Sequence, residues 1–277
     1  MQESMEDRVQ QLIAFVQGLS PATVDKPTLV YFDIVGIAWP SRCLLHLQKI
    51  DYEYVPITLM EWFHPAADGS QALKSAFRNR HVPLYVDSDV YLDQSTQILT
   101  TLAGRAGMMG GSEAETLAVN AVLAHCYDAL FHWNGIVPVN IRTNIADDVA
   151  QARLDSFMGG EMWGLVTNGY RNQLQAFVNY LQSNPADSGF MVGDALSAAD
   201  LAAFNVLCNW YKAFDREIFS TEFPLLDEYI QRIALHPGIS DYIRNVQEPT
   251  IWFELPAVAM RLTSPQDLQG LVTLAPA

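Results

Sequence analysis

Three short stretches of the sequence combine a polar group with a predicted element that would fix its direction. Tyr31 ends a short strand and carries a hydroxyl where the chain runs into a helix. Val82-Pro83 leads into a hairpin, and Gln94-Ser95 begins another helix. A hydroxyl, a backbone segment and a helix N-terminus could together hold a small thiol peptide and lower the pKa of its sulfur.

Ionising a thiol sets the energetic demand on such a site. A free thiol with a pKa of about 8.5 is only about 3% ionised at pH 7. Lowering that pKa by two units needs about 2.7 kcal/mol of differential stabilisation, and a charge-assisted hydrogen bond from a tyrosine hydroxyl is on roughly that scale. Tyr31 is therefore our candidate thiolate stabiliser. The alternative is a strand tyrosine with its ring in the core and its hydroxyl in water.

The composition indicates an ordinary globular protein. The chain has 277 residues, half of them apolar, and 17% are charged. A net charge of −15 argues against binding to nucleic acid or to an anionic membrane, because no basic stripe exists to displace phosphate counterions. No apolar run approaches the roughly 20 residues that span a bilayer, and the acidic N-terminus resembles no secretory signal.

The thiols and imidazoles show no metal-ligand spacing. The cysteines are odd in number and far apart, and we expect buried free thiols in a reducing, cytoplasmic compartment. They are Cys43, Cys126 and Cys208. The histidines without a partner acid at useful spacing are His46, His81 and His125, and these favour structural roles.

A mixed sheet with helices must position the three polar stretches. Residues 1–26 form an extension whose apolar spacing predicts a helix that stops at Ser20-Pro21. Strands are predicted at 28–33, 52–57, 83–86 and 90–92, and helices at 39–48, 71–77 and 94–104. This order implies a small mixed sheet with helices on its faces.

The second half of the chain is predicted to be all helical. Helices are expected at 113–133, 147–183, 198–213, 222–235 and 238–245. Ser197 and Asp200 have the spacing of a capping box, which concerns folding rather than catalysis. The resulting domains are a helical extension over 1–26, a sheet domain over 27–107, an all-α domain over 112–245 and an unassigned tail over 246–277.

Four segments in order resemble the cytosolic glutathione transferases of the tyrosine type, closest to the sigma class. The matching residues are Tyr31-Phe32 with Gly36, Ala38 and Arg42; Val82-Pro83 with residues 91–95; residues 190–194 with Ser197 and Asp200; and residues 223–226 with 236–239. The resemblance implies an α+β protein: a thioredoxin-like N-terminal domain with a mixed four-stranded sheet and helices, followed by an all-α helical-bundle C-terminal domain. It further implies a cytoplasmic homodimer with a detoxification role.

The resemblance also assigns roles to the candidate residues, with glutathione as co-substrate and no metal. Tyr31 would hold the thiolate, the backbone of Val82 before a cis Pro83 would pair with the glutathione cysteine, and Gln94 and Ser95 would take the γ-glutamyl carboxylate. Further residues are expected to bind the glycyl end, namely Trp62 and Lys74. A hydrophobic small molecule would meet Val35, Ile37, Cys126, Tyr127 and Leu130. Read without the resemblance, Pro83 could be a trans edge-strand proline and Ser95 only a helix cap.

Three positions depart from the family pattern. Val35 and Ile37 stand where many relatives carry arginine, and Asn120 stands where an acidic residue meets the glutathione amine across the dimer. Losing a charged partner weakens such a contact by about 1 kcal/mol or more. We therefore expect weaker glutathione binding, a less ionised thiol and a more apolar electrophile pocket.

Three functions remain open at this point. The first is a glutathione S-transferase that adds the thiolate to an apolar electrophile. A second is a glutathione-dependent isomerase or synthase of a lipid-like substrate, which would turn over generic electrophiles poorly. The third is a non-catalytic binding or structural protein on the same scaffold, resembling lens crystallins derived from it.

Overall fold

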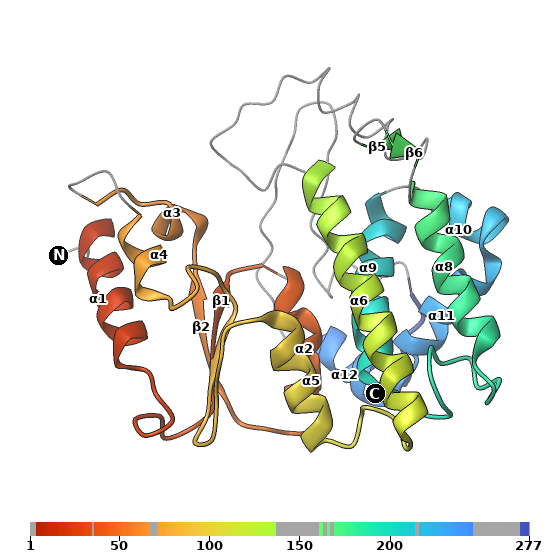
Figure 1. Cartoon of the computed structure of the whole chain (residues 1–277), viewed down its shortest axis with the longest axis horizontal. Coiled ribbons are helices and arrows are strands. Elements are labelled where there is room, and N and C mark those ends of the chain that lie inside the picture. The colour runs from red at the N-terminus through yellow and green to blue at the C-terminus, as the bar shows by residue number, and fades with distance from the viewer. Residues whose placement is uncertain are drawn as a thin grey trace. The chain divides into compact units, whose positions relative to one another are not determined.

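The described part of the chain forms two compact units, one up to Leu102 and the other from Ala103 on. The structure is a computed structural model (Figure 1). It describes residues 4–34, 36–66, 71–136, 161–162, 165–166, 169–213, 216–245 and 272–276. The expected fold class is confirmed, because a mixed four-stranded sheet with helices precedes a helical unit.

The sheet of the first unit has the strand order β2-β1-β3-β4. Its strands are β1 (Thr28–Phe32), β2 (Glu53–Ile57), β3 (Leu84–Val86) and β4 (Tyr91–Leu92). Strand β1 runs parallel to β2 and antiparallel to β3, and β3 and β4 form the predicted hairpin. Val30 pairs with both Val55 and Leu84, so the centre of β1 is the centre of the sheet.

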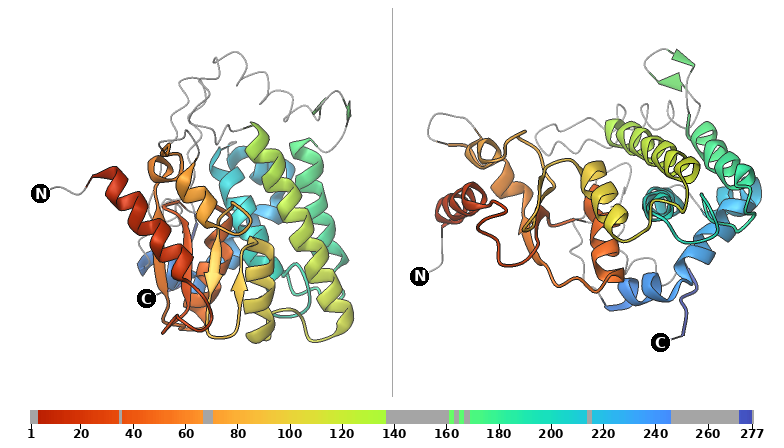
Figure 2. Two further views of the ribbon diagram at one scale, coloured as in Figure 1. Left: turned by 60° about the vertical axis from the view of Figure 1, so that its left-hand side comes forward. Right: turned by 60° about the horizontal axis from the view of Figure 1, so that its bottom comes forward.

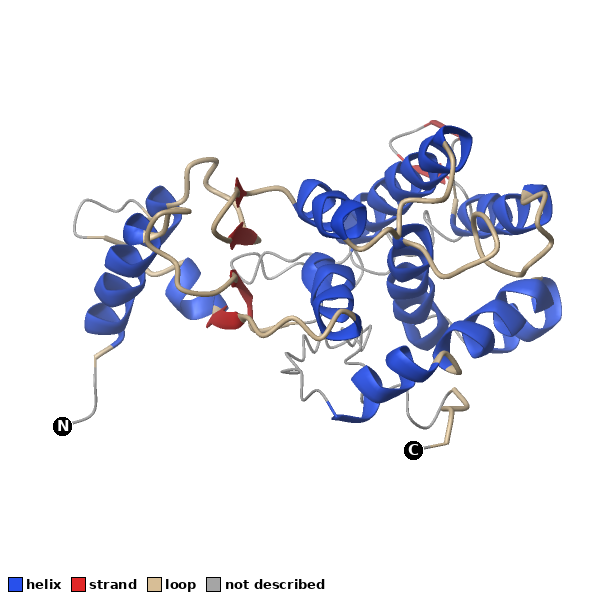
Figure 3. Cartoon of the chain, turned by 90° about the horizontal axis from the view of Figure 1, so that it is seen from below, coloured by secondary structure: helices blue, strands red, loops and turns tan. Residues whose placement is uncertain are grey.

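Helices cover both faces of this sheet, as Figures 2 and 3 show. Helix α2 (Trp39–Leu47) and helix α5 (Ser95–Arg105) lie on one side, and α1 (Met5–Gly18), α3 (Leu59–Trp62) and α4 (Ala72–Ala76) lie on the other. A short 3₁₀ turn, η1 (Gly36–Ala38), leads into α2. Helix α1 is the extension helix predicted from apolar spacing, and it buries Val9, Leu12 and Val16.

The second unit is built around one central helix. Helix α9 (Ala198–Ala213) is buried along nearly its whole length, and it packs against α6 (Glu113–Ile136), α10 (Arg216–Glu222) and α11 (Pro224–Ala234). Helix α11 also contacts α8 (Tyr170–Ser183) and α12 (Pro237–Asn245). A helix that is mostly apolar on all sides belongs in a core, which explains why polar residues are few between 198 and 211.

The capping box predicted before α9 is present and buried. The carboxylate of Asp200 accepts hydrogen bonds from the Ser197 N–H at 2.9 Å and the Ser197 hydroxyl at 2.8 Å. It also accepts from the Met191 N–H at 2.8 Å and the Tyr229 hydroxyl at 3.2 Å. Asp200 therefore joins the preceding loop, α9 and α11.

Three element predictions need correction. The continuous helix expected over 147–183 is wrong where the chain is described, because Glu161–Met162 and Leu165–Val166 form a small antiparallel ladder and α8 begins only at Tyr170. Helix α10 falls between the helices predicted over 198–213 and 222–235, and helix α3 was not predicted. Pro224 begins α11 and separates it from α10.

Residues 272–276 return to the second unit. The Thr273 N–H donates to the Gln231 side-chain oxygen at 3.0 Å, and the Ala275 N–H donates to the Ser240 hydroxyl at 2.9 Å. Among the described residues, no helix has the length and apolar character needed to cross a bilayer.

Candidate functional site

The hydroxyl of Tyr31 is fixed by the loop that follows β1. The side chain is 4% exposed, and its oxygen accepts a hydrogen bond from the Ile37 N–H at 3.2 Å. Gly36 lies against the ring with a φ of +45°, and a Cβ at this position would overlap the Tyr31 hydroxyl. Glycine is therefore required twice at position 36, for its left-handed backbone and for the close approach of the ring.

Arg42 holds the same loop from within the fold. The side chain is 2% exposed, and it donates to the Ile34 carbonyl at 2.9 Å and to the Tyr54 hydroxyl at 2.7 Å. Tyr54 in turn donates to the Phe32 carbonyl at 2.6 Å. The two carbonyls that flank the end of β1 are thus bound to α2 and β2, which makes Arg42 a positioning residue for the Tyr31 loop.

Tyr31 is protonated at neutral pH, and its burial favours this form further. Desolvation raises its pKa from 10.0 to about 12, against the opposing effects of the Ile37 N–H and the Arg42 charge. The pKa of Asp33 is also raised by burial, and the Arg42 charge again opposes that rise. At neutral pH the Tyr31 hydroxyl is consequently a hydrogen-bond donor beside a fixed positive charge.

Trp62 of α3 and Lys74 of α4 lie close together. The Trp62 ring is 5% exposed and packs edge-on against Phe32 at 5.3 Å and Phe77 at 5.4 Å between ring centroids. The Lys74 Nζ lies 5.9 Å from the centroid of the Trp62 ring. Phe32 is also 5.5 Å from the Tyr31 ring, so an aromatic series joins the predicted thiolate and glycyl positions.

The Val82–Pro83 peptide bond is cis, as the resemblance implied, and the trans alternative is wrong. Both residues are buried and directly precede β3. Because Leu84 pairs with Val30 in antiparallel register, the two residues lie beside the end of β1 that carries Tyr31.

The start of α5 is tied to the segment after α4. Asp93 accepts from the Arg78 guanidinium at 2.9 Å, and its carbonyl accepts from the Asn79 side chain at 2.8 Å. Gln94, which follows, is exposed, and Ser95 is buried at the first position of the helix. The hairpin and α4 therefore fix the direction in which the N-terminus of α5 points.

The candidates in the second unit occupy different surroundings. Cys126 is 3% exposed, and burial together with the charge of Asp200 raises the pKa of its thiol. Tyr127 is 49% exposed and Leu130 is half-buried. Asn120 is exposed, and its side chain donates to the Thr116 carbonyl at 2.9 Å.

Two further candidates complete the set. Ile37 is half-buried and contributes its backbone N–H to Tyr31. Val35 lies outside the described residues. No group of three or more His, Cys, Asp or Glu side chains suited to a metal ion occurs within the described ranges, and Cys43, Cys126 and Cys208 are free and buried.

Sequence reasoning missed one structural feature of this region. Thr58 caps α3 by accepting from the Glu61 N–H at 3.1 Å, and the Glu61 carboxylate returns to the Thr58 N–H at 2.6 Å. This is a capping box whose Thr-x-x-Glu pattern is visible in the sequence. It decides where α3 begins, and so where Trp62 is placed.

Known proteins resemble the chain in sequence. A family model described as glutathione S-transferase, C-terminal domain, matches residues 165–245. The chain is 26% identical to glutathione S-transferase P 1 of Xenopus laevis over 217 residues, which are 78% of this chain and 91% of that protein. The chain is thus similar in sequence to glutathione S-transferases over most of its length.

Solved structures extend the likeness to the whole fold. The Pi-class glutathione S-transferase of Onchocerca volvulus has a TM-score of 0.60 at 25% identity, covering 78% of this chain and 91% of that one. Prostaglandin synthase D of Nilaparvata lugens has a TM-score of 0.63 at 17% identity, covering 80% of this chain and all of that one, and shows the fold alone.

Proposed function

We propose that this protein is a glutathione S-transferase of the tyrosine type, sigma-like in its site, which conjugates the glutathione thiolate to an apolar electrophile. One observation carries the proposal. The Tyr31 hydroxyl is held in one direction by the Ile37 N–H and by the close approach of Gly36, at the end of the central strand of a glutathione-transferase fold.

The chemistry follows from the protonation state of Tyr31. Since the hydroxyl is neutral at pH 7, it donates a hydrogen bond to the glutathione sulfur and favours the thiolate. The thiol proton leaves to solvent. The sulfur then forms a bond to carbon, and either a leaving group departs with its electron pair or the double bond of the acceptor takes up a proton.

The remaining candidates would bind the peptide part of glutathione. Their proposed roles are hydrogen bonding by the Val82 backbone before Pro83 to the cysteine, binding of the γ-glutamyl carboxylate by Gln94 and Ser95, and contact of Trp62 and Lys74 with the glycyl end. The position of Lys74 supports this set in one respect. Lys74 adds a positive charge beside the Trp62 ring, where a terminal carboxylate needs one.

The electrophile would be a hydrophobic small molecule. Its proposed contacts are Val35, Ile37, Cys126, Tyr127 and Leu130, of which Tyr127 and Leu130 offer accessible apolar surface. We further propose a cytoplasmic homodimer, in line with the resemblance.

Calorimetric titration with glutathione at neutral pH tests the proposal. Saturable binding with a dissociation constant between micromolar and low millimolar is expected, followed by turnover of a generic aromatic electrophile. Ophthalmic acid, in which a methyl group replaces the thiol, should bind without any change in thiolate absorbance. Absence of glutathione binding would favour the non-catalytic binding or structural protein. It would mean that the site with Val35, Ile37 and Asn120 no longer binds glutathione.

A second candidate is a glutathione-dependent isomerase or synthase of a lipid-like substrate. It is favoured by the apolar residues at positions 35 and 37. Tight glutathione binding combined with negligible turnover of generic electrophiles would distinguish it from the conjugating enzyme.

A further inference from the structure

Helix α1 packs against the two short helices that carry Trp62 and Lys74. It contacts α4 and α3, and all three helices lie together beside the sheet (Figures 1 and 2). Helix α3 has four residues and α4 has five. Helices this short are unstable by themselves, so their geometry depends on what packs around them.

Arg8 makes the most specific contact between α1 and α3. Its Nε lies 3.2 Å from the Glu61 Oε1, and Glu61 is only 6% exposed. The other carboxylate oxygen accepts from the Thr58 N–H at 2.6 Å and from the Thr58 hydroxyl at 2.9 Å. Arg8 therefore binds the residue that closes the cap of α3, and Trp62 is the next residue in the chain.

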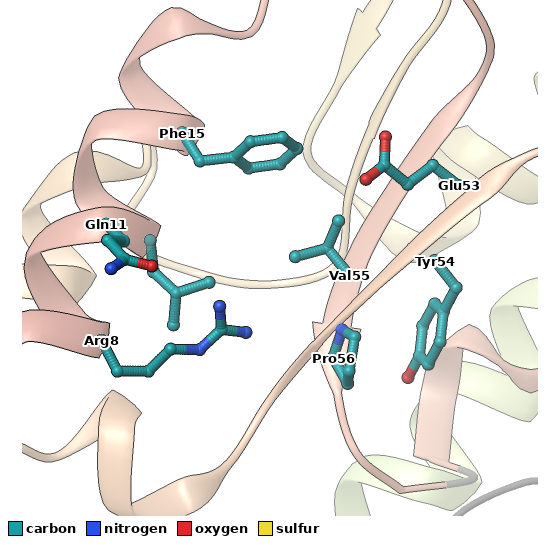
Figure 4. Close-up of a pocket in the computed structure, with 8 residues that line it drawn as sticks. Arg8, Gln11, Phe15, Glu53, Tyr54, Val55 and Pro56 are labelled. Carbon is teal, nitrogen blue, oxygen red and sulfur yellow. The ribbon is translucent and has the colours of Figure 1, made fainter. Parts of the chain in front are cut away.

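A pocket also lies between α1 and the sheet, and Arg8 takes part in its lining. This pocket has a volume of about 360 Å³ and lies between α1 and β2 (Figure 4). Its lining comprises Arg8, Gln11, Leu12, Phe15, Glu53, Tyr54, Val55 and Pro56.

We infer that α1 is a positioning element for the glycyl end of the glutathione site, and that Arg8 is its positioning residue. This inference rests on the proposed function. The Arg8–Glu61 ion pair fixes the start of α3, and the cap fixes Trp62 against Phe32 and Phe77, with Lys74 above its ring. The extension before the sheet thereby sets glutathione affinity without touching glutathione.

The test compares Arg8→Met with Lys26→Met in the full-length protein. Lys26 is a matched control, because its Nζ also lies 3.2 Å from a carboxylate oxygen, that of Asp51, but this partner is 88% exposed and caps no helix. Both variants remove one positive charge from the same unit. Arg8→Lys keeps the charge and should restore most of the wild-type behaviour.

Arg8→Met should raise the KM and dissociation constant for glutathione about 3- to 10-fold, the usual scale for coupling through packed neighbours. The kcat at saturating glutathione should stay unchanged, and amide exchange at Trp62 and Phe63 should accelerate even without glutathione. Lys26→Met should match wild type in all three. If the wild type binds glutathione and Arg8→Met binds it equally well, the proposed role of α1 is overturned, while the proposed function stands. A wild type that binds no glutathione would overturn the proposed function, and the exchange rates would still report whether α1 supports α3.

Discussion

Replacing Gly36 by alanine offers the sharpest test of how the Tyr31 loop is built. Gly36 has a φ of +45°, and an added Cβ would overlap the Tyr31 hydroxyl and lie 3.0 and 3.1 Å from the ring carbons Cε1 and Cζ. The ring is buried and its hydroxyl accepts from the Ile37 N–H, so moving the ring would cost this hydrogen bond. We expect the variant to displace either the loop or the hydroxyl.

Two separate costs contribute to the effect. An alanine in the left-handed region costs about 1–2 kcal/mol. Overpacking a filled site costs a further 1–3 kcal/mol or so. The free energy of unfolding of Gly36→Ala should therefore fall by about 2–5 kcal/mol, and turnover should fall with it, because the Tyr31 hydroxyl loses its fixed direction.

Gly107 supplies the control for the backbone cost. It has a φ of +69°, yet nothing lies within 4 Å of a Cβ built on it. Urea unfolding of Gly107→Ala should show a loss of only about 1–2 kcal/mol. In a double-mutant cycle, Gly36→Ala should cost about 1 kcal/mol less in a Tyr31→Phe background, since the overlapping oxygen is gone. Equal losses in the two glycine variants, with no coupling to Tyr31, would refute this account of the loop.

Three further outcomes are expected. Tyr31→Phe should lower turnover at neutral pH at least tenfold while glutathione affinity measured by calorimetry barely changes; equal turnover would remove Tyr31 from its role. Burial raises the pKa of Asp200 from 3.8 to about 6. The protonated carboxyl therefore contributes its full share to the free energy of unfolding below about pH 4, and this share is lost as the pH rises through 6. The stability gap between wild type and Asp200→Asn should thus shrink by up to about 3 kcal/mol between pH 4 and 7; a gap that widens would show that the hydrogen bonds to the carboxylate outweigh its burial. Ser240→Ala should cost about 1–3 kcal/mol in urea unfolding, because its buried hydroxyl bonds the last carbonyl of α11 and the Ala275 N–H. Ser75→Ala, at an exposed serine, should change stability by less than about 0.5 kcal/mol.

Local patterns in the sequence were sufficient for most of the sheet unit. The alternation and turn residues around 83–92 predicted the β3–β4 hairpin, and apolar spacing predicted α1. The capping residues Ser197 and Asp200 predicted the start of α9. These features depend on neighbours within a few residues, which a sequence displays directly.

Features that depend on long-range contact could not be predicted in the same way. The ion pair of Arg8 with Glu61 joins residues 53 positions apart, and nothing local marks either side chain as a partner. The helix predicted over 147–183 failed for a related reason, since its apolar residues suit a helix or a short strand pair until tertiary packing decides. Helix α3 was different, because its Thr58-x-x-Glu61 pattern was present and overlooked.

The prediction of a less ionised thiol rests on the charges missing at positions 35, 37 and 120. In the folded chain a different arginine, Arg42 of α2, lies beneath the loop, and its charge already opposes the rise in the pKa of Tyr31 caused by burial. A field that favours a phenolate at the Tyr31 oxygen also favours a thiolate placed next to it. Arg42 therefore supplies a positive charge near this oxygen although Val35 and Ile37 supply none, and the Tyr31→Phe variant, which keeps Arg42, separates the contribution of the hydroxyl from that of the field.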